Sequence, residues 1–254
     1  TMTGSFQRTT VNYMLDVQYG MAQREDISVV FNEPTPYRAR FEIAALDGVR
    51  RVEVQRTVPV QLHVGNRSYR TAIKGLEAGG DIQRVLDAGL VPVVPPQEGM
   101  LLTDYLGEFL GSEAGDRVLV EVLEGARPKR EVVVAGLVKE YLGVSAYMDR
   151  GALNRFMREG PAISGAYLAV EEPAMLPRLY RALKDSPRVA GVTQRKEEMR
   201  NFTQMMEESM LFYTFVASIF SVIIAFGVVY NSARIALTER SRELASLRVL
   251  GFTR

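Results

Sequence analysis

Charged residues are unevenly distributed along the chain, and one long segment has none. From Ser209 to Ala233 there are 25 consecutive residues without Asp, Glu, Lys or Arg. Its core, Leu211–Tyr230, is apolar on every helical face apart from three hydroxyl residues that can bond to the helix's own carbonyls: Thr214, Ser218 and Ser221. A helix of this length extends about 37 Å, more than the roughly 30 Å of a bilayer core. The pattern predicts a transmembrane helix over 209–233 rather than the buried central helix of a soluble domain.

The charges on either side of this segment predict its orientation. Residues 234–254 carry five Arg and two Glu, whereas residues 194–208 carry three basic and four acidic side chains. Positively charged flanks remain on the cytoplasmic side of a membrane. We therefore expect residues 234–254 to form a cytoplasmic segment and residues 1–208 to lie outside the membrane.

Two amphipathic segments are predicted to form a stalk next to the span. Residues 194–208 have a helical apolar stripe at Met199, Phe202, Met206 and Met210, which indicates packing against another helix rather than a ligand-binding surface. Residues 1–24 also show helical spacing, up to Met21. We expect residues 1–24 to be a stalk helix that continues an earlier transmembrane helix of a longer polytopic protein.

The domain between the stalk segments, residues 25–193, shows one pattern twice. A strand at 26–31 precedes a helix that Glu33-Pro34 opens and that runs to about Leu46, and a strand follows at 49–55. A strand at 166–170 similarly precedes a helix opened by Glu172-Pro173, with another strand from Val189. Either these are two ordinary units with similar turn chemistry, or they are pseudo-symmetric halves of one sheet.

The middle of the domain, about residues 57–160, reads as a small β-rich subdomain. Gly65-Asn66 predicts a hairpin between strands at 58–64 and 68–73, and the strongest strand patterns lie at 118–123 and 132–138. Short helices are expected within 100–110 and 149–158. The predicted fold class is α+β, with strand–helix–strand units around this β-rich insertion and a stalk helix that continues into the span.

Composition adds mainly exclusions. Among 254 residues there are 31 basic and 30 acidic residues, no Cys and one His. The chain thus has no disulfide, no thiolate nucleophile and no excess positive charge to hold nucleic acid. His63 lies in an alternating strand, no G-x-S-x-G motif occurs, and one His without Cys makes a metal site improbable. We expect no catalytic, cofactor-binding or metal site, and no enzyme.

Two sets of residues resemble a known family. Residues 238–251 read TERSRELASLRVLG, which closely resembles the signature after the second transmembrane helix of FtsX-type ABC transporter permeases, including MacB-like and LolC/LolE-like proteins. GMLLT at 99–103, LG at 110–111 and GDRV at 115–118 are similar to a run in the MacB-like periplasmic core. The tail motif is the more specific of the two because it follows a predicted span.

The resemblance implies a permease subunit in a bacterial inner membrane, with a periplasmic domain that handles a lipoprotein, lipid or peptide. The implied partners are the lipid bilayer, a second permease copy or paralogue, and a separate cytoplasmic ATPase that binds ATP. The sequence contains no phosphate-binding loop ending in Lys-Ser or Lys-Thr, in agreement with that division. The implied ATPase-coupling residues are Glu239, Arg240, Glu243, Arg248 and Gly251.

Alternatives exist for the tail and for the whole chain. The tail can be read as a solvated juxtamembrane helix whose Arg residues meet anionic lipid. The whole chain can be read as a single-span sensor with an external ligand-binding domain. It can also be read as an extracytoplasmic adhesion or assembly module, although that reading leaves the patterned tail unexplained. A permease should continue into another apolar span, whereas a sensor should continue into a dimerisation or signalling module.

Overall fold

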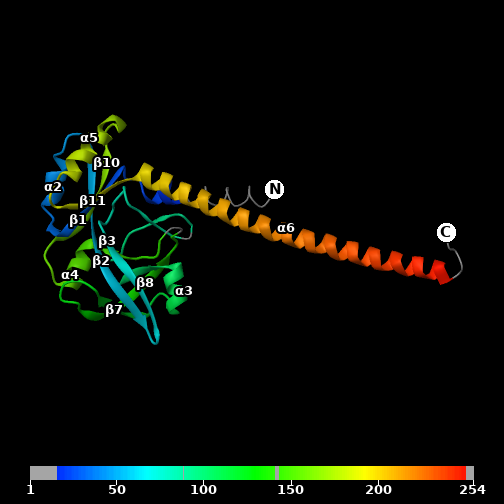
Figure 1. The fold of residues 1–254 in the computed structure, drawn as a ribbon. Helices are drawn as coiled ribbons and strands as arrows, with labels where there is room; N and C mark the ends of the chain where they lie inside the picture. The colour runs from blue at the N-terminus through cyan, green and yellow to red at the C-terminus, as the bar shows by residue number, and fades with distance from the viewer. Residues whose placement is uncertain (1–15, 88, 141–142, 250–254) are drawn as a thin grey trace. The chain divides into compact units, whose positions relative to one another are not determined.

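The computed structural model describes residues 16–87, 89–140 and 143–249, which divide into two units at Met199 (Figure 1). Nearly all of the secondary structure lies in the first unit, and the second consists of a long helix. In chain order the elements are η1 (Asp16–Ala22), β1 (Ile27–Pro36), α2 (Ala39–Ala44), β2 (Val49–Val64), β3 (Arg67–Leu76), β4 (Val85–Leu86), β5 (Pro92–Val93), β6 (Met100–Thr103), α3 (Asp104–Leu110), β7 (Arg117–Val122), β8 (Lys129–Val138), β9 (Ala146–Asp149), α4 (Arg150–Met157), β10 (Ala162–Val170), η2 (Pro173–Met175), α5 (Leu176–Lys184), β11 (Val189–Gln194) and α6 (Arg195–Val249).

Four strands in the order β11-β1-β10-β2 form one part of the first unit, and all neighbours are antiparallel. Each strand–helix–strand unit is split by a strand of the other unit, so β10 lies between β1 and β2. Ala39 and Ile43 of α2 and Leu179 and Leu183 of α5 pack into a common apolar core with the sheet. Both predicted units therefore belong to one sheet with a shared core.

Six strands form a closed barrel in the order β2-β3-β9-β6-β8-β7, because β7 also pairs with β2. Its interior is filled by aliphatic side chains that are almost fully buried, among them Val60, Leu62, Ile73, Leu102 and Val120. Helices α3 and α4 contribute to the same core. Because the barrel is closed, its strands have no free edge on which backbone N–H and C=O groups would be left unpaired.

Strand β2 belongs to both parts. Its first half pairs with β10 up to Gln55, and from Arg56 it pairs with β3. The strands that the sequence predicts at 49–55 and 58–64 are thus one continuous strand of 16 residues. The β-rich part is connected to the sheet through an unbroken ladder.

The predicted helix start at Glu33-Pro34 is wrong. Strand β1 continues to Pro36, and α2 covers only Ala39–Ala44. The register shifts between Val30 and Thr35, so Pro34 lies where no ladder hydrogen bond needs its missing N–H. A proline at a bulge has the same local signature as a proline that opens a helix.

Several local predictions are confirmed. The hairpin around Gly65-Asn66 joins β2 to β3, with Val64 paired to Arg67. A strand and short helix occupy 100–110, and α4 begins after Asp149, whose side chain accepts a hydrogen bond from the Ala152 N–H at 2.9 Å. Strand β9 was not predicted, and β10 begins at Ala162 rather than at Ala166.

The predicted N-terminal stalk helix lies mostly outside the described residues. Residues 1–15 are not described, and Asp16–Ala22 form the helical turn η1. Val17 and Ala22 of this turn are buried in a small apolar cluster with Leu86. The stalk over 1–24 stays a prediction, whereas η1 itself packs against the domain.

Candidate functional site

Helix α6 contains the segment predicted to cross a membrane. Among the residues described, it is the one helix long and apolar enough to do so, and its most apolar window has a mean hydropathy of 2.3 and is not buried. The hydroxyls of Ser218 and Ser221 donate to the carbonyls of Thr214 at 2.7 Å and Ala217 at 2.8 Å. These polar groups are satisfied within the helix, as the interior of a bilayer requires.

The residues predicted to couple to an ATPase follow this segment. Glu239, Arg240, Glu243 and Arg248 lie in the last part of α6, which is helical to Val249. The spacing of Glu239 and Glu243 puts them on one helix face. Gly251 lies outside the described residues, and the role of all five stays a prediction.

The other end of α6 is fixed to the domain through Arg195. Strand β11 ends at Gln194, which pairs with Ile27, and α6 begins at the next residue. The Arg195 N–H donates to the Asp26 carbonyl at 3.3 Å, and its Nη1 donates to the Tyr19 carbonyl at 2.7 Å. Arg195 is thus held by Asp26, directly before β1, and by η1. Residues 195–199 are called the root of α6 below.

A buried carboxyl group lies close to this root. Glu25 is 4% exposed, and its Oε2 has no hydrogen-bond partner in the described part of the chain. The pKa of Glu25 is raised to about 7, mainly by burial and in smaller part by the Glu198 carboxylate, against the lowering effects of a hydrogen bond from its own backbone and of Arg195 and Lys74. Burial also raises the pKa of Glu198. Two carboxyl groups with raised pKa values, Glu25 and Glu198, thus lie at the root.

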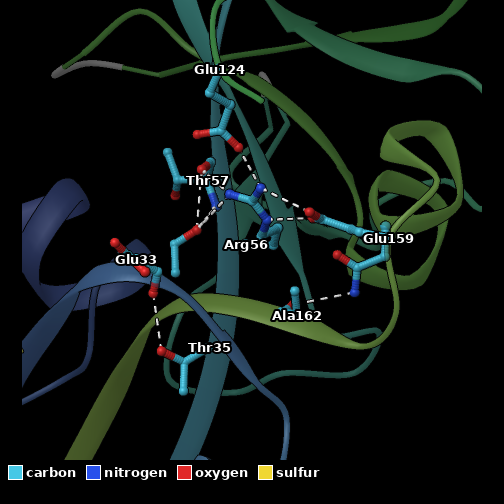
Figure 2. A network of polar contacts seen from close by, with 9 residues as sticks. Glu33, Thr35, Arg56, Thr57, Glu124, Glu159 and Ala162 are labelled. Carbon is cyan, nitrogen blue, oxygen red and sulfur yellow. Dashed lines mark hydrogen bonds and ion pairs between the residues drawn. The ribbon is translucent and has the colours of Figure 1, made fainter. Parts of the chain in front are cut away.

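A buried arginine lies where β2 passes from the sheet to the barrel (Figure 2). Arg56 is 1% exposed, its Nε donates to Glu159 Oε1 at 2.6 Å, and its Nη2 pairs with Glu124. Its Nη1 donates to Ser164 Oγ at 3.0 Å and to the Thr57 carbonyl at 2.9 Å. Burial opposes the charge, but the bonds to Glu159 and Glu124 raise the pKa of Arg56.

The Arg56 network joins segments that are far apart in the sequence. Glu124 lies between β7 and β8, Glu159 follows α4, and Ser164 belongs to β10. A sequence signal for this residue exists, because Arg56 occupies the inward phase of an alternating strand between Val54 and Val58. A positively charged side chain at an inward-facing strand position indicates a buried ion pair, although the sequence alone does not identify the partners.

The single histidine lies on β2, as the alternating pattern predicts. His63 Nε2 lies 3.0 Å from Glu121 Oε2 on the neighbouring β7, and the His63 side chain is 29% exposed. His63 and Glu121 thus form a cross-strand pair on a partly exposed face. This pairing is a structural explanation for a histidine at position 63.

No protein-family model and no curated protein matches the chain. Among solved structures, the extracellular domain of the noncanonic ABC-type transporter YknZ from Gram-positive bacteria is similar, at 14% identity and a TM-score of 0.45, over 63% of this chain and 92% of that one. The periplasmic region of MacB from Actinobacillus actinomycetemcomitans is similar at 12% identity and a TM-score of 0.47, over 77% of this chain and 98% of that one.

Both similar structures are regions that lie outside a membrane, and MacB is among the proteins that the sequence resemblance names.

Removing the Arg56 guanidinium should destabilise the domain strongly. In Arg56→Met the side chain still fills space, but the carboxylates of Glu124 and Glu159 lose their partner, which should cost on the order of 3 kcal/mol. Urea unfolding of the full chain in detergent micelles measures this loss. Arg117→Met is the matched control, since Arg117 is 72% exposed in its pair with Glu131. Equal midpoints for the two variants would show that the buried network does not stabilise the domain.

Glu25 should make stability fall as the pH rises. Its pKa of about 7 in the folded chain exceeds the ordinary value of 4.5, so the folded chain holds the proton more tightly than the unfolded chain. The free energy of unfolding should then decrease between pH 4.5 and 7 by on the order of 3 kcal/mol. In Glu25→Gln most of this decrease should disappear, with a smaller slope from Glu198.

Thermal unfolding of the full chain at a series of pH values measures this slope. Exposed Glu98→Gln is the control and should leave the slope unchanged. A slope in Glu25→Gln as steep as in the native sequence would refute the assignment to Glu25.

Proposed function

We propose that the chain is the permease subunit of an ABC transporter of the FtsX/MacB/Lol type. Residues up to 208 lie outside the membrane, residues 209–233 cross it, and residues 234–254 meet a cytoplasmic ATPase. The observation that carries this proposal is α6 itself, because one helix contains both the uncharged span and the patterned tail. Its net positive tail supports the orientation.

The proposed mechanism uses α6 as a rigid connection. Its 55 residues contain no Pro and one Gly, so nothing in the sequence predicts a sharp kink, and at about 1.5 Å per residue it extends roughly 80 Å. Closure of the ATPase displaces the tail, and the helix carries this displacement to Arg195. Because Arg195 directly follows β11, movement of the root acts on the sheet through the pairing of β11 with β1.

The chain does not supply the ATP chemistry in this proposal. ATP is bound by the separate ATPase subunit, and a second permease copy or paralogue completes the membrane part. The external domain changes its contacts with a substrate or partner such as a lipoprotein, lipid or peptide. The contribution of this chain is to convert a displacement at the cytoplasmic side into a movement of the external sheet.

Reversing the charges at Glu239 and Glu243 should uncouple the complex. In Glu239→Lys with Glu243→Lys, a face proposed to contact the ATPase changes from acidic to basic, which replaces attraction by repulsion. The expected result is loss of the stimulation of ATP hydrolysis that this chain gives its ATPase. The measurement is ATP turnover of the purified complex in lipid nanodiscs.

The matched control is the same double reversal at Glu207 and Glu208, which precede the span on its opposite side. It should leave the stimulation unchanged. Unchanged turnover in the Glu239/Glu243 variant would overturn the coupling assignment and favour a tail that contacts only anionic lipid.

A further inference from the structure

A polar cleft of about 380 Å3 lies between the two parts of the first unit. Helix α2 and strand β2 form its side toward the sheet, while the turn after β3 and the start of α4 form its side toward the barrel. Its volume falls in the range of small-molecule sites. The lining residues that matter for its chemistry are Arg40, Arg51, Glu53, Glu77, Asp149 and Arg150.

The three carboxylates of the cleft are already used within the chain. Glu53 accepts the backbone N–H groups of residues 81–83, at 2.6 Å for Asp81 and 2.9 Å for Ile82. Glu77 accepts the Tyr37 hydroxyl at 3.2 Å, and Asp149 caps α4. These oxygens stabilise loops and a helix end, so the carboxylates hold the walls of the cleft in place.

Arg51 is paired, with its Nη2 3.1 Å from Glu53 Oε1, whereas Arg40 and Arg150 keep donors without a partner among the described residues. Arg40 and Arg150 lie over the same Tyr37 ring, 5.7 Å and 4.6 Å from its centroid, and Arg40 Nη1 donates to the Tyr37 hydroxyl at 2.7 Å. The buried Nε of Arg150 has no hydrogen-bond partner among the residues that the structure describes. Its Nη2 is 3.7 Å from Glu77 Oε1, too far for a good hydrogen bond.

A guanidinium presents five N–H donors in a planar fork that matches a carboxylate bidentately. Two such groups, both held against one aromatic ring and both lining the cleft, can together receive an anionic group. Three arginines and three acidic residues line the cleft, so its formal charge is zero and a singly charged ligand suits it better than a highly charged one.

We propose that this cleft binds a small organic carboxylate, whose carboxylate group is held by Arg40 and Arg150. Arg40 belongs to α2 on the sheet and Arg150 to α4 beside the barrel, so the ligand contacts both parts of the domain. Occupancy of the cleft therefore favours the arrangement of sheet and barrel seen here. The inference is independent of the permease proposal, because it uses only the first unit.

The test is calorimetric titration of the full chain in detergent micelles with N-acetylglycine as the probe. The matched neutral probe is N-acetylglycinamide, and inorganic phosphate is a second anion. We expect N-acetylglycine to bind and its amide not to bind. Arg150→Gln and Arg40→Gln should each raise the Kd by about tenfold or more, as expected for loss of a charge-assisted hydrogen bond. Arg150→Lys should also bind more weakly, because lysine cannot form the bidentate contact.

Arg117→Gln is the control variant, since Arg117 lies exposed on β7 outside the cleft, and its Kd should equal that of the native sequence. Thermal unfolding of each variant verifies that it is folded before titration. Absence of N-acetylglycine binding, equal binding of the amide, or an unchanged Kd in both arginine variants overturns the proposal. Binding of phosphate without N-acetylglycine also overturns it, and identifies an oxyanion site instead.

Discussion

Strand β2 is the element on which the domain depends. It pairs with β10 in the sheet and with β3 and β7 in the barrel, so both parts share one continuous backbone. A strand can belong to two sheets only if its side chains suit both interiors. At the crossing point the inward position holds Arg56 rather than an aliphatic side chain, and two carboxylates pair with it.

This arrangement gives the junction a definite geometry. Arg56 must keep its hydrogen bonds to Glu159 and Ser164 once it is buried, because a buried charge without partners is costly. The cleft on the same boundary is also lined by carboxylates with fixed internal partners. Polar interactions, together with the two apolar cores on either side, hold the sheet and the barrel in register.

The span follows a simpler constraint. A segment in hydrocarbon must satisfy its own backbone, and the uncharged residues of α6 do so as a helix. The same helix continues beyond the span at both ends, from the ladder of β11 to Val249. In the proposed function this continuity matters more than any single side chain, because it connects the cytoplasmic tail to the edge of the external sheet.

Features that depend on local sequence could be predicted, and features that depend on distant pairing could not. The long apolar helix is evident from its lack of charge, and the hairpin at Gly65-Asn66 from its turn residues. The barrel closure, strand β9 and the partners of Arg56 could not be predicted, because Glu124 and Glu159 are 68 and 103 residues away in the sequence. The sequence around Pro34 predicts a helix start instead of a bulge for a related reason. Only the neighbouring strand in the sheet distinguishes the two.

The central claim is that α6 crosses a membrane with the domain outside and the tail in the cytoplasm. The chain has no Cys, so single cysteines at exposed Asn66 and in the tail at Ser241 report on each side. Spheroplasts expressing Asn66→Cys or Ser241→Cys are treated with a membrane-impermeant maleimide, before and after permeabilisation. The account predicts that Asn66→Cys is labelled in intact spheroplasts and Ser241→Cys only after permeabilisation. Labelling of both residues in intact spheroplasts, or the reverse order, would contradict it.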